Sequence, residues 1–266
     1  MGTIGEPTGR RRRKRQVVPA SMPKPEEVAA STQRRVSIGI GWSSHFERPG
    51  LLSFRYRKLR YAYRAPSFFL EAILANQAEV KFLRFDEELV HEDLDGTSGK
   101  IGESADLVYF ASHGEYKAHG YSLALHDADW QPCAKGLGTG SLSVAVFDTC
   151  DLVDLNDTSW RDAWISSVGA HLRLLLGFAS PATVAPDSTV RGKAFAEEII
   201  AGNPIGHAWL DAVHENAYPG ADVAVAIAFG VDTADAQWAL REMTLGDLPC
   251  PRSSPSPIVT AEAVCH

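Results

Sequence analysis

The sequence predicts an α/β fold in which a mostly parallel central sheet carries helices on both faces. Short apolar runs rich in β-branched residues alternate along the chain with longer segments of helical periodicity. Strands that alternate with helices favour parallel pairing, because each helix carries the chain back across the sheet. Two runs, 106–111 and 143–147, are almost continuously apolar, as expected of strands covered on both faces.

Local patterns place the individual elements. A helix over 67–78 begins beside Pro66, and Phe69, Ile73 and Gln77 follow at intervals of four residues. The predicted strands are 36–40, which ends at Gly41-Trp42, and then 80–85, 106–111, 143–147, 172–178 and 222–229.

Capping and turn residues bound the later helices. Asp157-Thr158-Ser159 offers side-chain N-caps ahead of one helix. A second helix over 190–201 is closed by Gly202. A third helix over 204–217 has proline in its first turn, where the missing N–H costs no hydrogen bond.

Composition divides the chain into three parts. Residues 1–33 are rich in Arg, Pro, Ser and Glu and lack periodicity, which predicts a disordered basic leader. Residues 248–266 hold four further prolines among serines, which predicts a flexible Pro/Ser-rich tail. The folded domain is therefore expected over 34–247, a length that can bury one core.

The charge balance argues against a nucleic-acid partner. The chain carries 26 basic and 33 acidic residues, a net charge of −7. Residues 1–15 hold six of the basic residues and one acidic residue, which leaves 20 basic and 32 acidic residues in the remainder. Phosphate affinity needs clustered cations. No apolar stretch approaches the ~20 residues of a membrane helix, so no membrane partner is expected either.

Cysteine usage indicates a reducing compartment. Cys133, Cys150, Cys250 and Cys265 are too few for a disulfide framework in a chain this long, and no C-x-x-C pair suggests structural zinc. No apolar signal-peptide core follows the basic run. We therefore expect free thiols in a cytoplasmic protein that needs no metal or other cofactor, and the oligomeric state stays open.

Two predicted strands end in side chains that can carry chemistry. Ser112-His113-Gly114 follows the run over 106–111, and Asp148-Thr149-Cys150-Asp151 follows the run over 143–147. Catalytic groups in parallel sheets lie beyond the carboxyl ends of the strands. If these strands are neighbours, their ends lie about 4.8 Å apart. The sequence therefore predicts that His113 and Cys150 face one groove.

An imidazole beside a thiol is the pairing that nucleophilic catalysis by cysteine needs. A free thiol has a pKa of about 8.5, so little of it is thiolate at neutral pH. A nearby His113 can take the proton from Cys150 as substrate binds. Gly114 lets a carbonyl approach the backbone closely. The N–H groups of Gly114 and Cys150 are candidates for an oxyanion hole.

These motifs resemble the caspase-like cysteine peptidases, which include caspases, legumains, gingipains and separases. The resemblance implies a caspase-haemoglobinase three-layer α/β fold with a His/Cys dyad in which the histidine comes first. His113 precedes Cys150 by 37 residues, fewer than the ~50 of caspases. The caspase signature Gln-Ala-Cys-x-Gly is replaced by Asp148-Thr149-Cys150-Asp151-Leu152. The chain is therefore not expected to be a caspase proper.

Four segments resemble a little-characterised bacterial family of the same group, the DUF6345 domain. The segments are 107–114, 144–150 with the Trp160/Trp164 stretch, 171–178 with 192–196, and 205–209. The resemblance implies that His113 is the general base and acid and that Cys150 is the nucleophile. It implies that Gly114 and Cys150 donate to the oxyanion.

Further residues are candidates for substrate binding. Trp42 and His45 follow the first strand and are expected at the same sheet edge. The segment from Ser180 to Asp187 follows the strand over 172–178 and could form a pocket wall. Asp151 and Asp187 are acidic groups that would favour Arg or Lys in the substrate. Asp148 could hold a loop or bias the local field.

A metal hydrolase is a competing interpretation. His113, His119, His126, Asp127 and Asp129 lie close in sequence. Metal sites usually take two ligands from one short motif on a fixed element. Here the histidines are six and seven residues apart across an expected loop, which disfavours a metal site.

The run Lys135–Ser141 superficially resembles a phosphate-binding loop. Such a loop follows a strand and opens a helix, whereas this run precedes a strand and begins with its lysine. We interpret it as a flexible turn.

The sequence therefore predicts a metal-independent cysteine hydrolase that cleaves a peptide or amide bond through Cys150 and His113. Two alternatives stay open. Acyl or peptidyl transfer, or cyclisation, needs the same thioester, with an amine in place of water. A binding scaffold built on a catalytically dead peptidase fold would keep the architecture without the reaction.

Overall fold

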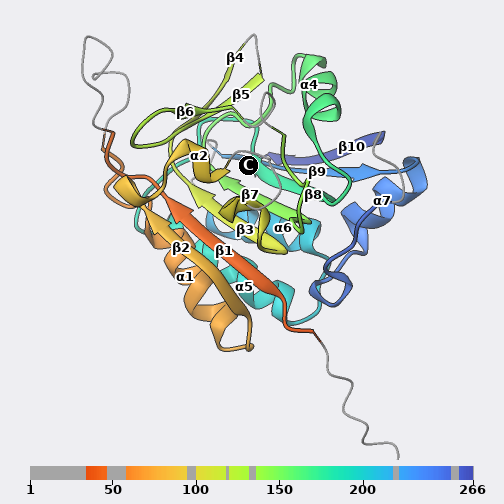
Figure 1. The fold of residues 1–266 in the computed structure, drawn as a ribbon, viewed down its shortest axis with the longest axis horizontal. Coiled ribbons are helices and arrows are strands. Elements are labelled where there is room, and N and C mark those ends of the chain that lie inside the picture. The colour runs from red at the N-terminus through yellow and green to blue at the C-terminus, as the bar shows by residue number, and fades with distance from the viewer. Residues whose placement is uncertain are drawn as a thin grey trace, which may run out of the picture. The chain divides into compact units, whose positions relative to one another are not determined.

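A seven-stranded sheet is the centre of the computed structural model, with strand order β10-β9-β8-β7-β3-β1-β2 (Figure 1). The structure describes residues 34–46, 58–94, 100–117, 120–131, 136–217, 222–252 and 258–265. Its strands are β1 (Ser37–Trp42), β2 (Glu79–Phe85), β3 (Leu107–Ala111), β7 (Val144–Asp148), β8 (Leu174–Phe178), β9 (Val223–Gly230) and β10 (Ile258–Cys265). A second sheet contains β4 (Gly114–Lys117), β5 (Gly120–Ala124) and β6 (Asp129–Trp130).

The helices lie between the strands as the sequence pattern predicts. They are α1 (Arg64–Leu74), α2 (His91–Leu94), α4 (Ser159–Ser167), α5 (Arg191–Ile200), α6 (Ile205–Asn216) and α7 (Thr233–Arg241). Helix α1 ends four residues earlier than predicted, and Gln77 beyond it has a φ of 62° that a helix does not accommodate. Among the described residues, no helix combines the length and apolar character needed to cross a bilayer.

The predicted parallel sheet is confirmed, with a change of direction at its far side. Strands β2, β1, β3, β7 and β8 pair in parallel. Strand β9 runs antiparallel to β8, and β10 runs antiparallel to β9. The reason is the connection, because the chain between β8 and β9 forms two consecutive helices, α5 and α6. A pair of helices returns the chain to the end of the sheet from which it came.

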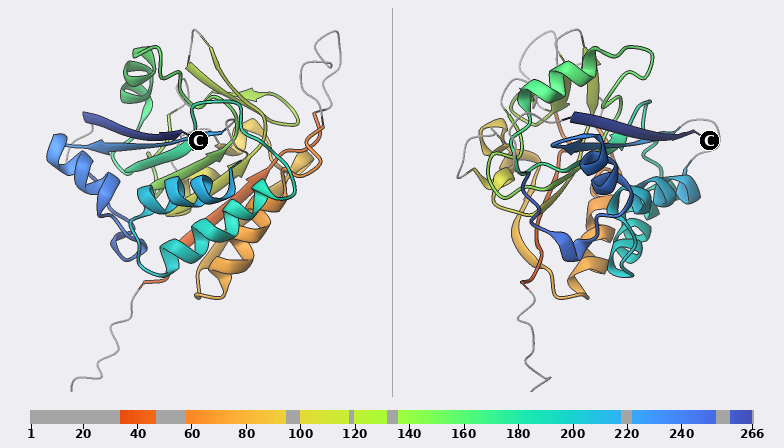
Figure 2. Two further views of the ribbon diagram at one scale, coloured as in Figure 1. Left: turned by 180° about the vertical axis from the view of Figure 1, so that it is seen from behind. Right: turned by 90° about the vertical axis from the view of Figure 1, so that its right-hand side faces the viewer.

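Each face of the sheet buries its own core, which gives the three layers. Helices α1, α5 and α6 cover one face (Figure 2). Trp209 of α6 packs there against Phe195 and Phe178. The other face packs against β5, β6 and α4, with Trp130 and Trp164 in its core. The second outer layer is therefore partly sheet, whereas the sequence analysis expected helices on both faces.

The small sheet corrects the expectation that residues 113–129 form a loop. Strand β4 pairs antiparallel with β5, and β5 pairs with β6. The alternation is short and mixed with polar and glycine residues, so the pattern does not predict strands strongly. Tyr121 and Leu123 of β5 are fully buried against the central sheet, and this burial stabilises the hairpin.

The end of the chain is also different from the prediction. Residues 258–265 form β10 and pair along the whole length of β9, so this part of the expected 248–266 tail is an edge strand. Apolar side chains at Val259 and Ala261 pack on the core, which explains why this segment forms a strand of the sheet. The chain divides into two units at Arg34/Arg35. The leader over 1–33 lies outside the described residues.

The run before β7 is a turn, and it is fixed by a buried carboxylate. Gly138 and Gly140 both donate their N–H groups to Glu103, at 2.7 Å each. These N–H groups are therefore engaged and cannot cradle a phosphate. Over Gly136–Ser141 the expected turn is present, but Glu103 holds it in place, which corrects the interpretation that it is flexible. Lys135 lies outside the described residues.

Candidate active site

The two strand-end motifs lie side by side. Strands β3 and β7 are parallel neighbours, with Ala111 opposite Asp148. His113 and Cys150 each follow that pair by two residues. The chain therefore leaves the sheet at the same level in both motifs, as the strand-end argument predicts.

His113 and Cys150 line a single pocket of about 200 Å³. The pocket lies beyond the carboxyl ends of β3 and β7. Its other lining residues come from the turns around the two motifs, from the segment before α1 and from the segment after β8: Leu59, Ser112, Thr149, Ala182 and Val184. Both candidate residues are partly exposed, so a substrate can reach them.

Strand β5 anchors both motifs through the buried hydroxyl residue that precedes each candidate. Ser112 donates to the carbonyl of Ala124. Thr149 shares a hydrogen bond with the hydroxyl of Tyr121. The small sheet therefore fixes the backbone on both sides of the pocket, and catalytic side chains need such rigid support.

Gly114 lies directly against the cysteine turn. A Cβ atom added at Gly114 would lie 2.5 Å from the carbonyl oxygen of Cys150 and 2.8 Å from the hydroxyl of Thr149. No real Cβ makes such contacts. Only glycine therefore allows the two turns to approach this closely.

Two backbone N–H groups beside the pocket are available as donors. Ala124 donates to the carbonyl of His113, so His113/Ala124 is a hydrogen-bonded pair of the β4–β5 ladder. The next pair, Gly114/Leu123, is then a non-hydrogen-bonded pair, and the Gly114 N–H points away from β5. Within the described ranges, the Cys150 N–H has no backbone acceptor.

The electrostatic surroundings keep the Cys150 thiol protonated. Burial raises the pKa of Cys150, and the carboxylates of Asp151, Asp148 and Asp222 raise it further. The N–H of Ala182, which donates to Sγ at 3.3 Å, acts in the opposite direction. The resting thiol is therefore a weak nucleophile, and attack needs a base.

The loop after β1 packs against His113. The ring of Phe46 lies 5.1 Å from the imidazole, centroid to centroid, at an angle of 49°. The same loop is held by Asp86, whose carboxylate accepts from the N–H groups of Ser44 at 2.7 Å and His45 at 3.0 Å. His45 itself hydrogen bonds to Asp86 through Nδ1 and does not line the pocket.

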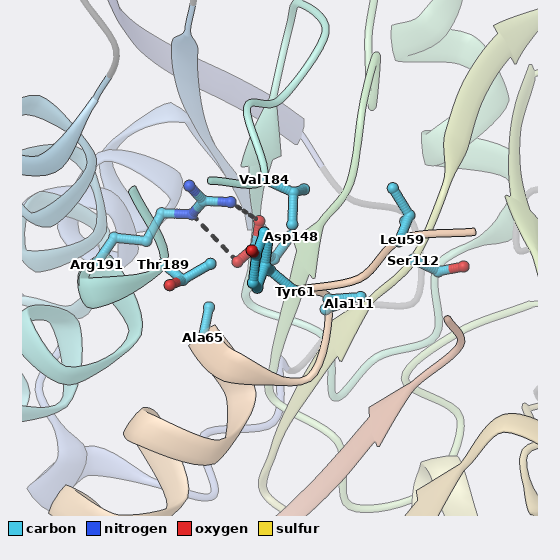
Figure 3. Close-up of a pocket in the computed structure, with 10 residues that line it drawn as sticks. Leu59, Tyr61, Ala65, Ala111, Ser112, Asp148, Val184, Thr189 and Arg191 are labelled. Carbon is cyan, nitrogen blue, oxygen red and sulfur yellow. Dashed lines mark hydrogen bonds and ion pairs between the residues drawn. The ribbon is translucent and has the colours of Figure 1, made fainter. Parts of the chain in front are cut away.

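Asp148 is a structural anchor in a closed space. It forms a buried ion pair with Arg191 of α5 at 2.5 Å (Figure 3). It also accepts from the hydroxyl of Tyr109 at 2.8 Å. The cavity beside it holds about 10 Å³, the room of about one water molecule. The structure therefore does not place Asp148 where substrate could bind, and it supports the alternative expectation that this residue holds a loop.

The other predicted binding residues take varied positions. Trp42 stacks on Phe85 at 5.1 Å, away from the pocket lining. Ser180 accepts from the N–H of Val223 at 2.8 Å and so joins β8 to β9. Asp187 is exposed and is not part of the lining. The predicted wall over 180–187 is present in part, because Ala182 and Val184 do line the pocket.

Asp151 lies next to the nucleophile in an acidic neighbourhood. It is half-buried and has a φ of 50°. Burial raises the pKa of Asp151, and the nearby carboxylates of Glu115 and Asp154 raise it further. Asp151 is not part of the pocket lining, but its charge is close enough to raise the pKa of Cys150.

Sequence reasoning missed several residues around the pocket. Ser112 and Thr149 adjoin the motifs and could have been found from that position. Leu59 and Phe46 come from distant parts of the chain, and Arg191 is a lone arginine at a helix start. Nothing in the sequence distinguishes these three from ordinary surface residues.

The histidines and aspartates of the metal interpretation do not come together. Asp127 pairs with His91 at 2.7 Å, and Nδ1 of His126 lies 3.3 Å from the carbonyl oxygen of His45. Within the described ranges, no three His, Cys, Asp or Glu side chains are placed to hold a metal ion. His119 lies outside these ranges.

Comparisons with known proteins give a family and a structural neighbour. A search of the curated proteins found no match. Among solved structures, the chain is similar to caspase-1 from Spodoptera frugiperda, with 13% sequence identity and a TM-score of 0.42. That match covers 86% of this chain and 87% of the other. A family described as a domain of unknown function, DUF6345, matches residues 58–249, which include both strand-end motifs. The chain belongs to this family.

Proposed function

We propose that the chain is a cysteine-dependent hydrolase that cleaves a peptide or amide bond, with Cys150 as nucleophile and His113 as general base and acid. One observation carries the proposal: both side chains line the same pocket at the carboxyl edge of the sheet. The closely packed Gly114 and the free orientation of its N–H support an oxyanion site at the same place.

The reaction proceeds in two halves. His113 takes the thiol proton as Sγ of Cys150 attacks the carbonyl carbon, and the N–H groups of Gly114 and Cys150 stabilise the oxyanion. The C–N bond breaks when His113 gives that proton to the leaving amine, which leaves a thioester. Water then attacks the thioester and loses a proton to His113. The acid is released, and the proton returns to the thiol.

The raised pKa of the thiol fits this order of events. Cys150 is protonated at rest, so its proton must leave during attack and not before it. A buried thiol that is activated only by bound substrate also avoids reaction with oxidants and small electrophiles. The enzyme is expected to be selective for substrates that reach His113 and Cys150 together.

The charge around the pocket supports a preference for basic substrates. Asp151 is close enough to Cys150 to raise its pKa, and Glu115 and Asp154 are close enough to Asp151 to raise the pKa of that residue. Asp148, in contrast, is neutralised by Arg191. We therefore propose that an Arg or Lys side chain next to the cleaved bond is preferred, and that Asp151 contributes to this preference.

Labelling with a peptidyl acyloxymethyl ketone tests the site, with arginine beside the ketone. The ketone must sit in the oxyanion site for the thiol to attack it. Peptide mapping of the labelled protein is expected to find Cys150 modified at least about ten-fold faster than Cys250, since general-base assistance is worth 10²–10⁴-fold. Iodoacetamide, which needs no oxyanion site, should show little preference for Cys150.

His113→Ala provides the matched variant, and circular dichroism checks that it remains folded. The variant should lose the fast peptidyl labelling but keep the slow iodoacetamide reaction. Equal peptidyl labelling of Cys150 and Cys250, or labelling of Cys150 unchanged in a folded His113→Ala, would contradict the proposed dyad.

A further inference from the structure

Two arginine side chains are buried together at the amino end of β8. Arg173, which directly precedes β8, is 2% exposed, and Arg252, in the segment before β10, is 5% exposed. Burial lowers the pKa of Arg252 to about 10, and the charge of Arg173 contributes to this shift. The backbone also brings the two residues to one place, because Arg252 donates its N–H at 2.7 Å to the carbonyl of Ala170, three residues before Arg173.

One carboxylate faces the pair, and each of its oxygens already accepts a hydrogen bond. Oδ1 of Asp235 accepts from Arg173 at 2.7 Å, and its Oδ2 accepts from the N–H of Val231 at 2.8 Å. Arg252 donates through Nη2 to the carbonyl of Gly169, which is neutral. Only Arg173 therefore hydrogen bonds to a carboxylate, and among the described residues the charge of Arg252 has no carboxylate partner.

Three donors of the pair are buried without an acceptor. They are Nε of Arg173 and both Nε and Nη1 of Arg252, and no described residue accepts from them. A buried charged donor that lacks an acceptor costs more free energy than a neutral one. Native proteins seldom leave such groups unsatisfied. Their coincidence in one place indicates a missing partner of negative charge.

We propose that Arg173 and Arg252 bind a small oxyanion of the phosphate type. Guanidinium groups present paired N–H donors that match the oxygens of such anions. The indole of Trp238 lies 5.8 Å from the guanidinium carbon of Arg173, so it holds one side of the site. Because both arginines are buried, a phosphate group carried by a macromolecule could not reach them, so the ligand is a free anion.

This site is separate from the candidate active site. Arg173 precedes the first residue of β8, whereas Ala182 and Val184 follow its last residue and line the Cys150 pocket. The two sites therefore lie toward opposite ends of the same strand. The proposal does not depend on the proposed hydrolase activity, and its test uses no substrate.

Thermal unfolding in chloride buffer tests the site, with inorganic phosphate added at constant ionic strength. An anion that binds only the folded chain raises Tm, by roughly 5 °C when it is a hundred-fold above its Kd. Arg252→Gln removes the excess charge and two of the three donors, so its Tm should not respond to phosphate. Arg241→Gln is the control, because Arg241 is 58% exposed on α7 and its variant should respond like the wild type.

Tryptophan fluorescence provides a second measurement, in case Arg252→Gln does not fold. Phosphate should change the emission of the wild type, and Trp238→Phe should abolish that change. Arg252→Lys, which keeps the charge but loses the planar fork, should respond more weakly than the wild type. The proposal is overturned by a wild-type Tm and emission that do not change with phosphate. Equal responses in the wild type and every arginine variant would also overturn it, because they indicate a general salt effect.

Discussion

Asp86 shows how a single side chain can order the approach to the pocket. Its backbone is left-handed, with a φ of 46°, and its carboxylate holds Ser44 and His45, the residues before Phe46. Phe46 in turn packs on His113. Burial acts to raise the pKa of Asp86, but the hydrogen bonds from Ser44 and His45 outweigh it and lower the pKa below 3.8.

Asp86→Asn should lower the free energy of unfolding at neutral pH by about 1–3 kcal/mol, because hydrogen bonds to a charged acceptor are lost. Asparagine tolerates the left-handed backbone, so the substitution isolates the charge. A depressed folded-state pKa stabilises above the unfolded value of 3.8 and loses that stabilisation as pH falls through the lower folded value. Urea unfolding at neutral and acidic pH should therefore find a difference that shrinks in acid.

Glu87→Gln, a change at the exposed neighbour, is the control and should alter the stability at neither pH. A difference between wild type and Asp86→Asn that stays constant from neutral to strongly acidic pH would show that the charge is not responsible.

The sequence located His113 and Cys150 because each follows an apolar run that only a buried strand explains. Their position at neighbouring strand ends needs no information beyond that pattern. Asp86 and Phe46 could not be found in this way, because each acts through contacts that exist only after folding. Trp42 and Asp187 were predicted near the pocket but do not line it. Proximity in sequence to a strand end does not fix the direction of a side chain.

Helix α5 is fastened to β7 by one buried pair of charges. Arg191, the first residue of the helix, donates to both oxygens of Asp148, the last residue of the strand. Its Nη1 also donates to the carbonyl groups of Thr183 and Ser188 at 2.9 and 3.0 Å. The pair therefore connects the helix, the strand below Cys150 and the loop that forms the pocket wall.

Arg191→Met should destabilise the chain by about 3–5 kcal/mol, because it leaves the Asp148 carboxylate buried without its partner. Combining it with Asp148→Asn removes that charge, so the double variant should be more stable than Arg191→Met alone. Chemical unfolding of the wild type, Arg191→Met, Asp148→Asn and the double variant measures the coupling. Two substitutions whose effects simply add would contradict a coupled pair.

Lys193→Met on the same helix is the matched control for loss of a charged partner. Lys193 is 56% exposed and lies 3.6 Å from Glu197, so its ion pair is screened by water. The change in its free energy of unfolding should stay below about 0.5 kcal/mol.

At the scale of the elements, long apolar patterns predicted strands and helices correctly, whereas short amphipathic patterns did not reveal their strands. The five parallel strands and the helices over 190–217 were predicted because burial on both faces or a full helical stripe leaves a strong pattern. Strands β4 to β6 are short and rich in glycine and polar residues. Strand β10 follows a Pro/Ser-rich stretch. It forms a strand because it pairs with β9, and that pairing cannot be recognised from the residues of β10 alone.

At the scale of the whole molecule, the net negative charge and the carboxylates near Cys150 both favour positively charged ligands. Outside residues 1–15 the chain carries 20 basic and 32 acidic residues. Such a surplus attracts cations over distances of about 10 Å at moderate salt. The carboxylates near Cys150 add a local field at the pocket, where Asp151 is half-buried beside the nucleophile.

Given the proposed hydrolase, peptides with Arg or Lys beside the cleaved bond should show a higher kcat/KM than peptides with Asp or Glu there. Electrostatic steering raises association rates by about 10–10³-fold at low ionic strength, so added salt should reduce the preference. Asp151→Asn should reduce it further by removing the nearest charge. Asp187→Asn is the control, because Asp187 is exposed and its charge is not among those that act on Cys150, and it should leave the preference unchanged. Equal kcat/KM values for basic and acidic peptides at every salt concentration would refute the preference. They would leave the proposed dyad untouched, because the preference depends on charge and the dyad depends on proton transfer between a thiol and an imidazole.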